Sequence, residues 1–348
     1  MSRRRGRLRP PRGAARPPAR TGGSDRPRVR ITSPSDLLAI IPYLIGFHPQ
    51  ESVVALFVRH GQVELAARMD LPPVEAADQL AGYWSTLAGQ QGADRVGLVA
   101  YSADREPAVA LLAALVARLQ HHELADVLYA DGARWWSITC QQSCCPPTGT
   151  PYSLDAHPVA AEAVLAGMAP QPDRAALVAM VAGPDPADLD RLDAVLDQVL
   201  ADLFDVLQDQ ERAVKAVQTA VSDALVAAEI TDEQCAVLAL LCIDVVVRDH
   251  AWAMMSRENA EEHVRLWRQV VARVPDDISA APLGLLGMAA WISGNGALLN
   301  CCAEQLSVVH PDYGLGEALA ELSDRAIPPA AWDEWAVDFR ASLQLVPG

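Results

Sequence analysis

The sequence is poor in lysine, in aromatic side chains and in long apolar runs. Lys215 is the single lysine and aromatic residues make up 5%, so the 51% of hydrophobic residues must form a mainly aliphatic core. No apolar run approaches the roughly 20 residues that a membrane-spanning helix needs. The opening arginines are not followed by the apolar segment of a secretory signal. We therefore expect a soluble cytoplasmic protein without a membrane partner.

Complete active-site motifs are also absent. We find no spacing typical of a P-loop, a nucleophile elbow or a zinc-protease helix, and we predict no cofactor. Seven cysteines are an odd number, so at least one cannot pair within the chain. In the cytoplasm, reduced thiols are the default. The sequence alone does not decide whether the protein is an enzyme.

Charge is divided unevenly along the chain. The first 30 residues hold eleven arginines and one acid, Asp25, which leaves 17 basic and 43 acidic residues and a formal net charge of −26 for the rest. So acidic a body argues against nucleic acid or an anionic membrane as its partner. The Arg/Pro-rich tail, residues 1–30, is too poor in apolar residues to fold and is predicted to be disordered. It is either a basic arm for nucleic acid or phosphate, or a solvated extension.

Residues 31–155 are predicted to form an α/β domain. The stretch SPSDLLAIIPYLIGF opens it with a helix that Ser33 or Ser35 caps. The elements that follow have the order ββαβαββ, with a hairpin turn at Asp131-Gly132. This order favours a mixed sheet with helices packed on it.

Residues 156–348 show only helical patterns and are assigned to an all-helical domain. The segment 285–329 contains a tryptophan-bearing helix, a glycine turn, an alanine-rich helix and, after a proline, a further helix. This pattern resembles the helix pair of tetratricopeptide-type repeats. Since one such unit is visible, we do not expect an extended solenoid.

Several stretches together are similar to one family. They are DLLAIIPYLIGFHPQESVVALFV, ARMDLP, CCPPTGTP, VVVRDHAWAMM, LWRQVVARVP and AAWISGNGALLNCCAEQL. On these motifs the chain resembles the actinobacterial domain-of-unknown-function family 4192 from Ile31 to Trp335. That family has no established activity, substrate or catalytic residue. The resemblance therefore implies a bacterial cytoplasmic protein and no particular mechanism.

The first candidate site is the loop GFHPQES, between a helix end and a buried strand. It contains His48, Glu51 and Ser52, while Arg68 and Asp70 end the strand that pairs with this one. Loops in such positions often hold ligands. Together these side chains could bind an anion or perform acid–base chemistry. The alternative is a structural turn in which His48 bonds backbone and Arg68 pairs with an acid.

The second candidate site is CQQSCCPPTGTP, residues 140–151. Cys140, Cys144 and Cys145 could supply three thiolates to zinc, but the second ligand pair typical of zinc sites is missing. In a redox interpretation, Cys140 could resolve a sulfenate on either of the two adjacent cysteines. In a structural interpretation, the prolines and glycine form a domain junction and cysteine packs as a small apolar residue.

Three further motifs are interpreted structurally. Asp244 and Arg248 lie four residues apart on a helix predicted over 232–248, a spacing that favours an ion pair. In an alternative interpretation, Arg248 and Asp249 form a buried pair that faces a pocket. The turn SGNG could offer helix amides to a phosphate, but Asn295 as an N-cap accounts for it. Cys301-Cys302 lies in a helical pattern, and at least one of the two is expected in the core.

These patterns favour a non-enzymatic regulatory or protein-interaction module whose helical domain offers a groove to a protein partner. One alternative is an enzyme or a small-molecule sensor with its site at the sheet edge. Another is a redox or metal sensor built on the cysteines. Nucleic acid is expected as a partner only through the basic tail.

Overall fold

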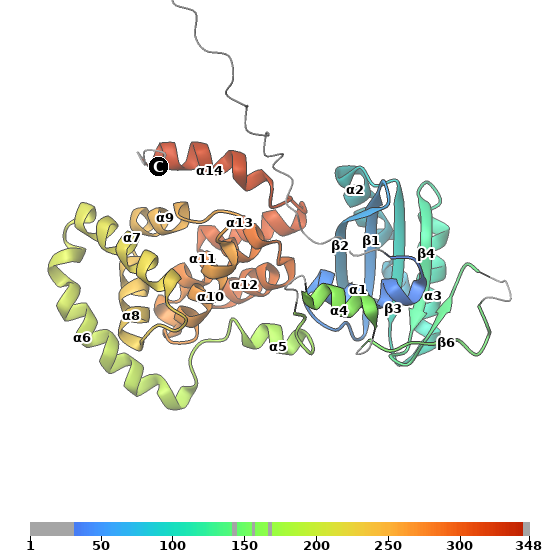
Figure 1. The fold of residues 1–348 in the computed structure, drawn as a ribbon, viewed down its shortest axis with the longest axis horizontal. Helices are drawn as coiled ribbons and strands as arrows, with labels where there is room; N and C mark the ends of the chain where they lie inside the picture. Colours follow the sequence, from blue (N-terminus) through green and yellow to red (C-terminus); the bar gives the residue numbers. More distant parts are fainter. Residues whose placement is uncertain (1–30, 141–144, 155–156, 166–168, 344–348) are drawn as a thin grey trace, which may run out of the picture.

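Two units lie side by side in the protein, a sheet covered by helices and an array of helices (Figure 1). The structure is a computed structural model that describes residues 31–140, 145–154, 157–165 and 169–343. A mixed sheet near the N-terminus is followed by a run of helices. This confirms the fold class predicted from the sequence.

The sheet has six strands in the order β2-β1-β3-β4-β5-β6. β3 and β4 are parallel, and the other neighbouring pairs are antiparallel. The strands are β1 (Ser52–Arg59), β2 (Gln62–Asp70), β3 (Arg95–Tyr101), β4 (Glu123–Ala130), β5 (Arg134–Ser137) and β6 (Thr150–Pro151). The predicted order ββαβαββ is present, and β6 is an additional short strand that the sequence analysis missed.

The sheet is buried on both faces. The helices that cover it are α1 (Pro34–Ile45) on one face and α2 (Ala77–Gln91) and α3 (Arg105–Arg118) on the other. Side chains alternate along a strand, so Val54 and Leu56 of β1 pack with α1, while Val53 and Phe57 pack with α2 and α3. This explains why β1 reads as a continuous apolar run.

The predicted cap of α1 is confirmed at Ser33. Its side chain accepts a hydrogen bond from the Asp36 amide, and Asp36 in return accepts from the Ser33 amide. Gly46 ends the helix with φ 83°, a left-handed conformation that favours glycine. The loop that follows α1 therefore leaves the helix in a defined direction, toward β1.

The remaining helices form the second unit, with one exception. They are α4 (Pro158–Leu165), α5 (Arg174–Ala179), α6 (Leu189–Leu207), α7 (Gln210–Val226), α8 (Asp232–Leu241), α9 (Val245–Ala253), α10 (Ala260–Val271), α11 (Ala280–Ser293), α12 (Gly296–Val309), α13 (Gly314–Asp324) and α14 (Ala331–Ser342). The exception is α4, which packs through Val159 and Ala163 on Ala39 and Ile40 of α1. We therefore propose a domain boundary after α4 in place of residue 155.

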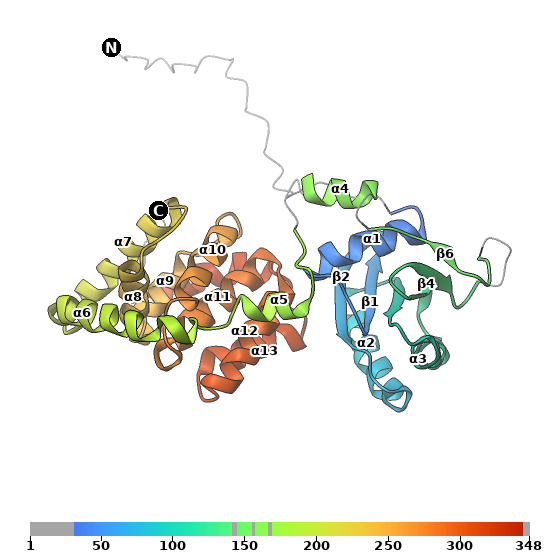
Figure 2. The same ribbon diagram turned by 90° about the horizontal axis from the view of Figure 1, so that it is seen from below.

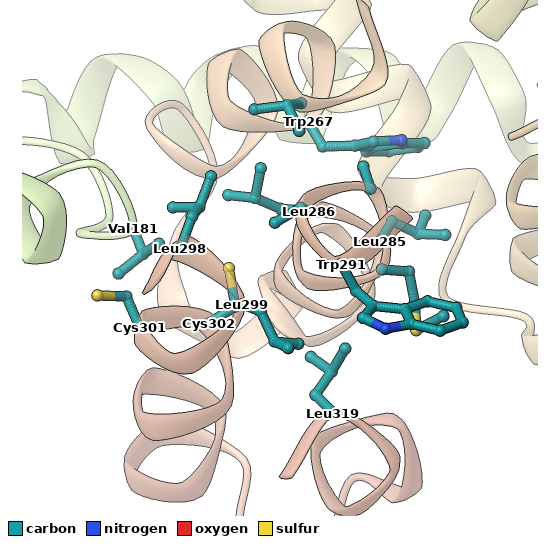
Figure 3. Packing of buried hydrophobic residues seen from close by; sticks show 14 of the residues in the cluster. Val181, Trp267, Leu285, Leu286, Trp291, Leu298, Leu299, Cys301, Cys302 and Leu319 are labelled. Atoms are coloured by element: carbon teal, nitrogen blue, oxygen red, sulfur yellow. The ribbon is translucent and has the colours of Figure 1, made fainter. Parts of the chain in front are cut away.

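The predicted helix pair is present as α11 and α12, joined by a tight turn at Gly294. Gly284 and Gly287 of α11 face α13 so closely that a Cβ atom on either would collide with Leu315 or Leu319. Figure 3 shows Leu319 against this pair and Cys302 inside it. Cys301 and Cys302 are both buried, which confirms the expectation that at least one of these cysteines lies in the core.

One apolar core crosses from the sheet into the helical unit. It runs from the α1 face of the sheet through Leu177 and Val181 to the helices α7–α13. Figure 2 shows α5 at the place where the two units meet. No described helix combines the length and the apolar character that a bilayer crossing requires.

Candidate functional site

Three of the five residues predicted in the first candidate site lie together at the end of β2. Arg68 donates from Nε to Ser52 Oγ at 2.8 Å, and its Nη1 lies 2.7 Å from the Asp70 carboxylate. The guanidinium also lies over the Phe47 ring, 5.4 Å from its centroid. Burial lowers the pKa of Arg68, and Asp70 offsets part of that fall. The cation is thus neutralised and covered by its own neighbours.

Glu51 points away from this group. It has φ 40°, and its carboxylate accepts from Ser102 Oγ at 2.7 Å and from the Ala103 amide at 2.8 Å. These bonds fix the loop between β3 and α3, where Asp104 caps the helix. Glu51 therefore stabilises a loop at the carboxyl end of β3 and does not join Arg68.

His48 contributes backbone rather than side-chain contacts to this region. Its amide donates to the Gln171 carbonyl at 3.1 Å, and Gln171 donates back to Gly46 at 2.8 Å. A Cβ atom on Gly46 would also contact Asn295 and Ala297 in the turn between α11 and α12. The loop GFHPQES is therefore a joint between the sheet unit and the helical unit, which supports the structural interpretation.

A second ion pair lies near this joint. Arg174 of α5 donates to both carboxylate oxygens of Glu304 on α12, at 2.6 and 2.5 Å. Both residues influence the pKa of Arg68, so the charges of β2, α5 and α12 lie close together. The sequence analysis missed Arg174 and Glu304 because 130 residues separate them and no local pattern connects them.

The described cysteines of the second candidate site line a pocket at the far edge of the sheet. The pocket has a volume of about 310 Å³, and Cys140, Cys145, Arg105 and Trp136 are among its walls. Arg105 lies over the Trp136 ring, 4.9 Å from its centroid. Cys144 lies outside the described residues. Among the described residues, no three histidine, cysteine or acidic side chains gather in a way that could hold a metal ion.

The proline-glycine stretch after these cysteines belongs to the sheet, so we propose that the domain junction lies further along the chain. Thr150 and Pro151 form β6, which pairs with β5 and keeps the chain in the sheet. Gly149 has φ 75°, and a Cβ atom there would collide with the Trp136 indole. Trp136 in turn donates to the Pro147 carbonyl at 3.0 Å. The stretch thus wraps one tryptophan, and the units meet elsewhere, near β2.

The predicted ion pair between Asp244 and Arg248 is wrong. The helix predicted over 232–248 is divided into α8 and α9, and Asp244 caps α9 by accepting from the Val246 amide at 2.8 Å. Arg248 pairs instead with Asp249 at 2.5 Å and donates to the Tyr313 hydroxyl at 2.8 Å. The N-cap role satisfies exposed helix amides, which the i, i+4 spacing rule ignores. Asn295 is the N-cap of α12, as predicted.

The sequence analysis also missed a line of side chains on the outer side of α6. We name Asp190, Asp193, Asp197, Leu200 and Phe204 the α6 stripe. Their spacing of three or four residues places them on one side of the helix. The two apolar members are 44% and 59% exposed, and among the described residues no arginine or lysine pairs with the three acidic members.

The opposite side of α6 explains why this stripe stays outside. Leu192 and Val199 are buried, and Val199 packs against Ala236 and Leu240 of α8. The helix therefore already has its apolar side covered, and the α6 stripe is an additional surface. The spacing of three or four residues in the stripe can be read from the sequence once the bounds of the helix are known. Before that, the many apolar residues of the chain obscure it.

Comparison with known proteins identifies one family. A family model described as a domain of unknown function (DUF4192) matches residues 34–330. No curated protein and no solved structure matches the chain. The match includes the α6 stripe and the joint, and it ends before α14.

Proposed function

Because the chain belongs to the family of the domain of unknown function DUF4192, whose description assigns no activity, we propose its function from geometry. The protein is a non-enzymatic interaction module that docks a basic segment of a protein partner on the α6 stripe. The observation that carries this proposal is the line of three aspartates, with no ion pair to any described residue, and two exposed apolar side chains on one helix face.

The apolar end of the stripe supplies the anchor of the proposed contact. Covering an exposed leucine or phenylalanine side chain is worth on the order of 2 kcal/mol when the burial is complete. Aromatic side chains surrounded by less important contacts are typical anchors of interfaces. Phe204, at 59% exposure, is the most exposed phenylalanine or tryptophan among the described residues.

The acidic end of the stripe selects the charge of the partner. Docking a second copy through this face would place two sets of Asp190, Asp193 and Asp197 in one interface, and like charges gathered in an interface oppose association. A segment rich in arginine pairs with the carboxylates and also speeds the encounter. The strong negative charge of residues 31–348 acts in the same direction.

The first candidate site gives no competing support for an enzyme. Arg68 is covered by Phe47 and paired with Asp70, and Glu51 is used to fix a loop. Acid–base chemistry needs side chains that converge on a place where a reacting group can lie. The contacts of these residues favour a role in joining the two units.

Binding of a short labelled peptide of alternating arginine and leucine tests the proposal. The full chain carries Arg3→Gln, Arg4→Gln, Arg5→Gln, Arg7→Gln and Arg9→Gln, so that the arginine cluster at its own N-terminus does not compete for the peptide. We expect Phe204→Ser to lower the affinity for the peptide about tenfold. A loss of about 1.4 kcal/mol from apolar burial corresponds to that factor. Fluorescence anisotropy measures the affinity.

The matched control is Val226→Ser, since Val226 is also an exposed apolar residue, at 88%, but lies at the end of α7. This variant should bind the peptide as the parent does. Equal weakening by both substitutions, or no effect of Phe204→Ser, contradicts docking on the α6 stripe.

A further inference from the structure

The α6 stripe has a candidate occupant within the same chain. We propose that residues 1–30 dock on it in cis and thereby compete with the segment of the protein partner. The inference rests on the proposed function, because it names what covers the same surface in the absence of a partner. It makes the basic tail a built-in competitor of docking.

Charge complementarity is the first support. The tail contains eleven arginines and one acid, whereas the rest of the chain has a net charge of −26. The stripe presents three aspartates that no described cation neutralises. Arginine forms two parallel hydrogen bonds to a carboxylate more readily than lysine, so an arginine-only tail suits a row of aspartates.

The order of residues in the tail is the second support. In RRRGRLRPP, Arg3, Arg4, Arg5 and Arg7 come before Leu8, and Pro10-Pro11 follows. The stripe has the same order, with aspartates first and then Leu200 and Phe204. Proline-rich segments pack well on exposed aromatic rings. A parallel alignment therefore matches charge with charge and apolar with apolar side chains.

The length of the tail permits the contact. About 20 residues separate Arg9 from the start of the described chain, and an extended chain of that length spans about 70 Å. A folded body of this size has a radius of gyration of about 20 Å. Tethering also gives the tail a millimolar effective concentration. A contact with a dissociation constant well below a millimolar would then be formed most of the time.

Tryptic cleavage of the tail tests this proposal on the full chain. Trypsin cuts after arginine, so the release of tail fragments, followed by mass spectrometry, reports how accessible the tail is. At low salt we expect release to be at least tenfold slower in the natural protein than in the double variant Asp193→Arg/Asp197→Arg. Raising the salt concentration should remove the difference, because it screens exposed charges.

Asp202→Arg is the matched control. Asp202 belongs to the same helix and is exposed, but lies on the side of α6 away from the stripe. Its variant should release tail fragments as slowly as the natural protein. Equal release rates in all three proteins overturn docking of the tail, and so does protection that is seen only after a DNA duplex is added.

A second measurement separates the failure of this inference from the failure of the proposed function. If the tail is unprotected but the arginine-leucine peptide still binds the α6 stripe, the cis occupant is wrong and the docking function stands. If the tail is unprotected and the peptide does not bind, both are wrong. Tail protection that requires high protein concentration indicates docking in trans on a second copy and overturns docking in cis.

Discussion

Replacing His263 with leucine should reduce, by about 3 kcal/mol, the amount by which the free energy of unfolding falls when the pH is lowered from 6.5 to 4. His263 lies on α10 and is fully buried, and neither ring nitrogen makes a hydrogen bond of ordinary geometry to a described residue. Burial lowers the pKa of His263 to about 4, although the backbone of Met254 offsets part of the fall. An unfolded histidine has a pKa near 6.5, and each unit of difference corresponds to about 1.4 kcal/mol.

The direction of the effect follows from proton uptake. Between pH 6.5 and pH 4 the unfolded chain binds a proton that the folded chain does not, so the free energy of unfolding falls as the pH falls. Above pH 6.5 the contribution of His263 is fully present. The leucine variant lacks this term, and its stability near neutral pH should be equal or higher, because a buried polar group without partners is costly.

Urea denaturation at a series of pH values measures this effect as the difference between variant and parent. The matched control is His121→Leu, since His121 is exposed. Its pH profile should run parallel to that of the parent. If His263→Leu also runs parallel to the parent between pH 7 and pH 4, burial of a neutral imidazole is not the source of acid sensitivity.

Replacing Arg68 with alanine should lower the free energy of unfolding by about 2 kcal/mol. The side chain of Arg68 is only 13% exposed, and it covers Phe47 while donating to Ser52, which is fully buried. The substitution removes a charge-assisted network and the packing of the long side chain. We expect this loss because the residue joins β2 to the loop after α1.

Asp70→Asn is the informative comparison for Arg68. The Asp70 side chain is 83% exposed, and exposed ion pairs contribute less than about 1 kcal/mol. Chemical denaturation of both variants should therefore show a large loss for Arg68→Ala and a small one for Asp70→Asn. An Arg68→Ala protein as stable as the parent would leave this side chain available for another role and would revive the candidate site.

Local rules were sufficient for strands β1 to β5 and for some helix ends. The cap at Ser33, the left-handed Gly46 and the turn at Asp131-Gly132 depend on residues that are neighbours in the chain. The strand β6 was not predictable in this way, because two residues that include a proline have no strand pattern of their own. Only its pairing with β5 and the packing of Gly149 on a tryptophan define it.

The candidate site illustrates a different limit. The sequence brought Arg68, Asp70 and Ser52 together correctly, since paired strands of an antiparallel hairpin place their ends side by side. It could not show that Glu51 turns toward Ser102, because that choice depends on the neighbouring strand β3. Likewise, the α6 stripe becomes visible only when packing against α8 shows which side of the helix is already covered.

Charge reversal on α6 tests the central claim most directly. Affinity for the arginine-leucine peptide is compared by fluorescence anisotropy between Asp193→Arg/Asp197→Arg and Asp202→Arg, each combined with the five glutamine substitutions in the tail. If the α6 stripe docks basic segments, the double variant loses at least tenfold in affinity and the Asp202 variant keeps it nearly unchanged. If both variants instead lose affinity in proportion to the positive charge that each adds, the peptide binds the acidic body without a defined site. That result contradicts the proposal.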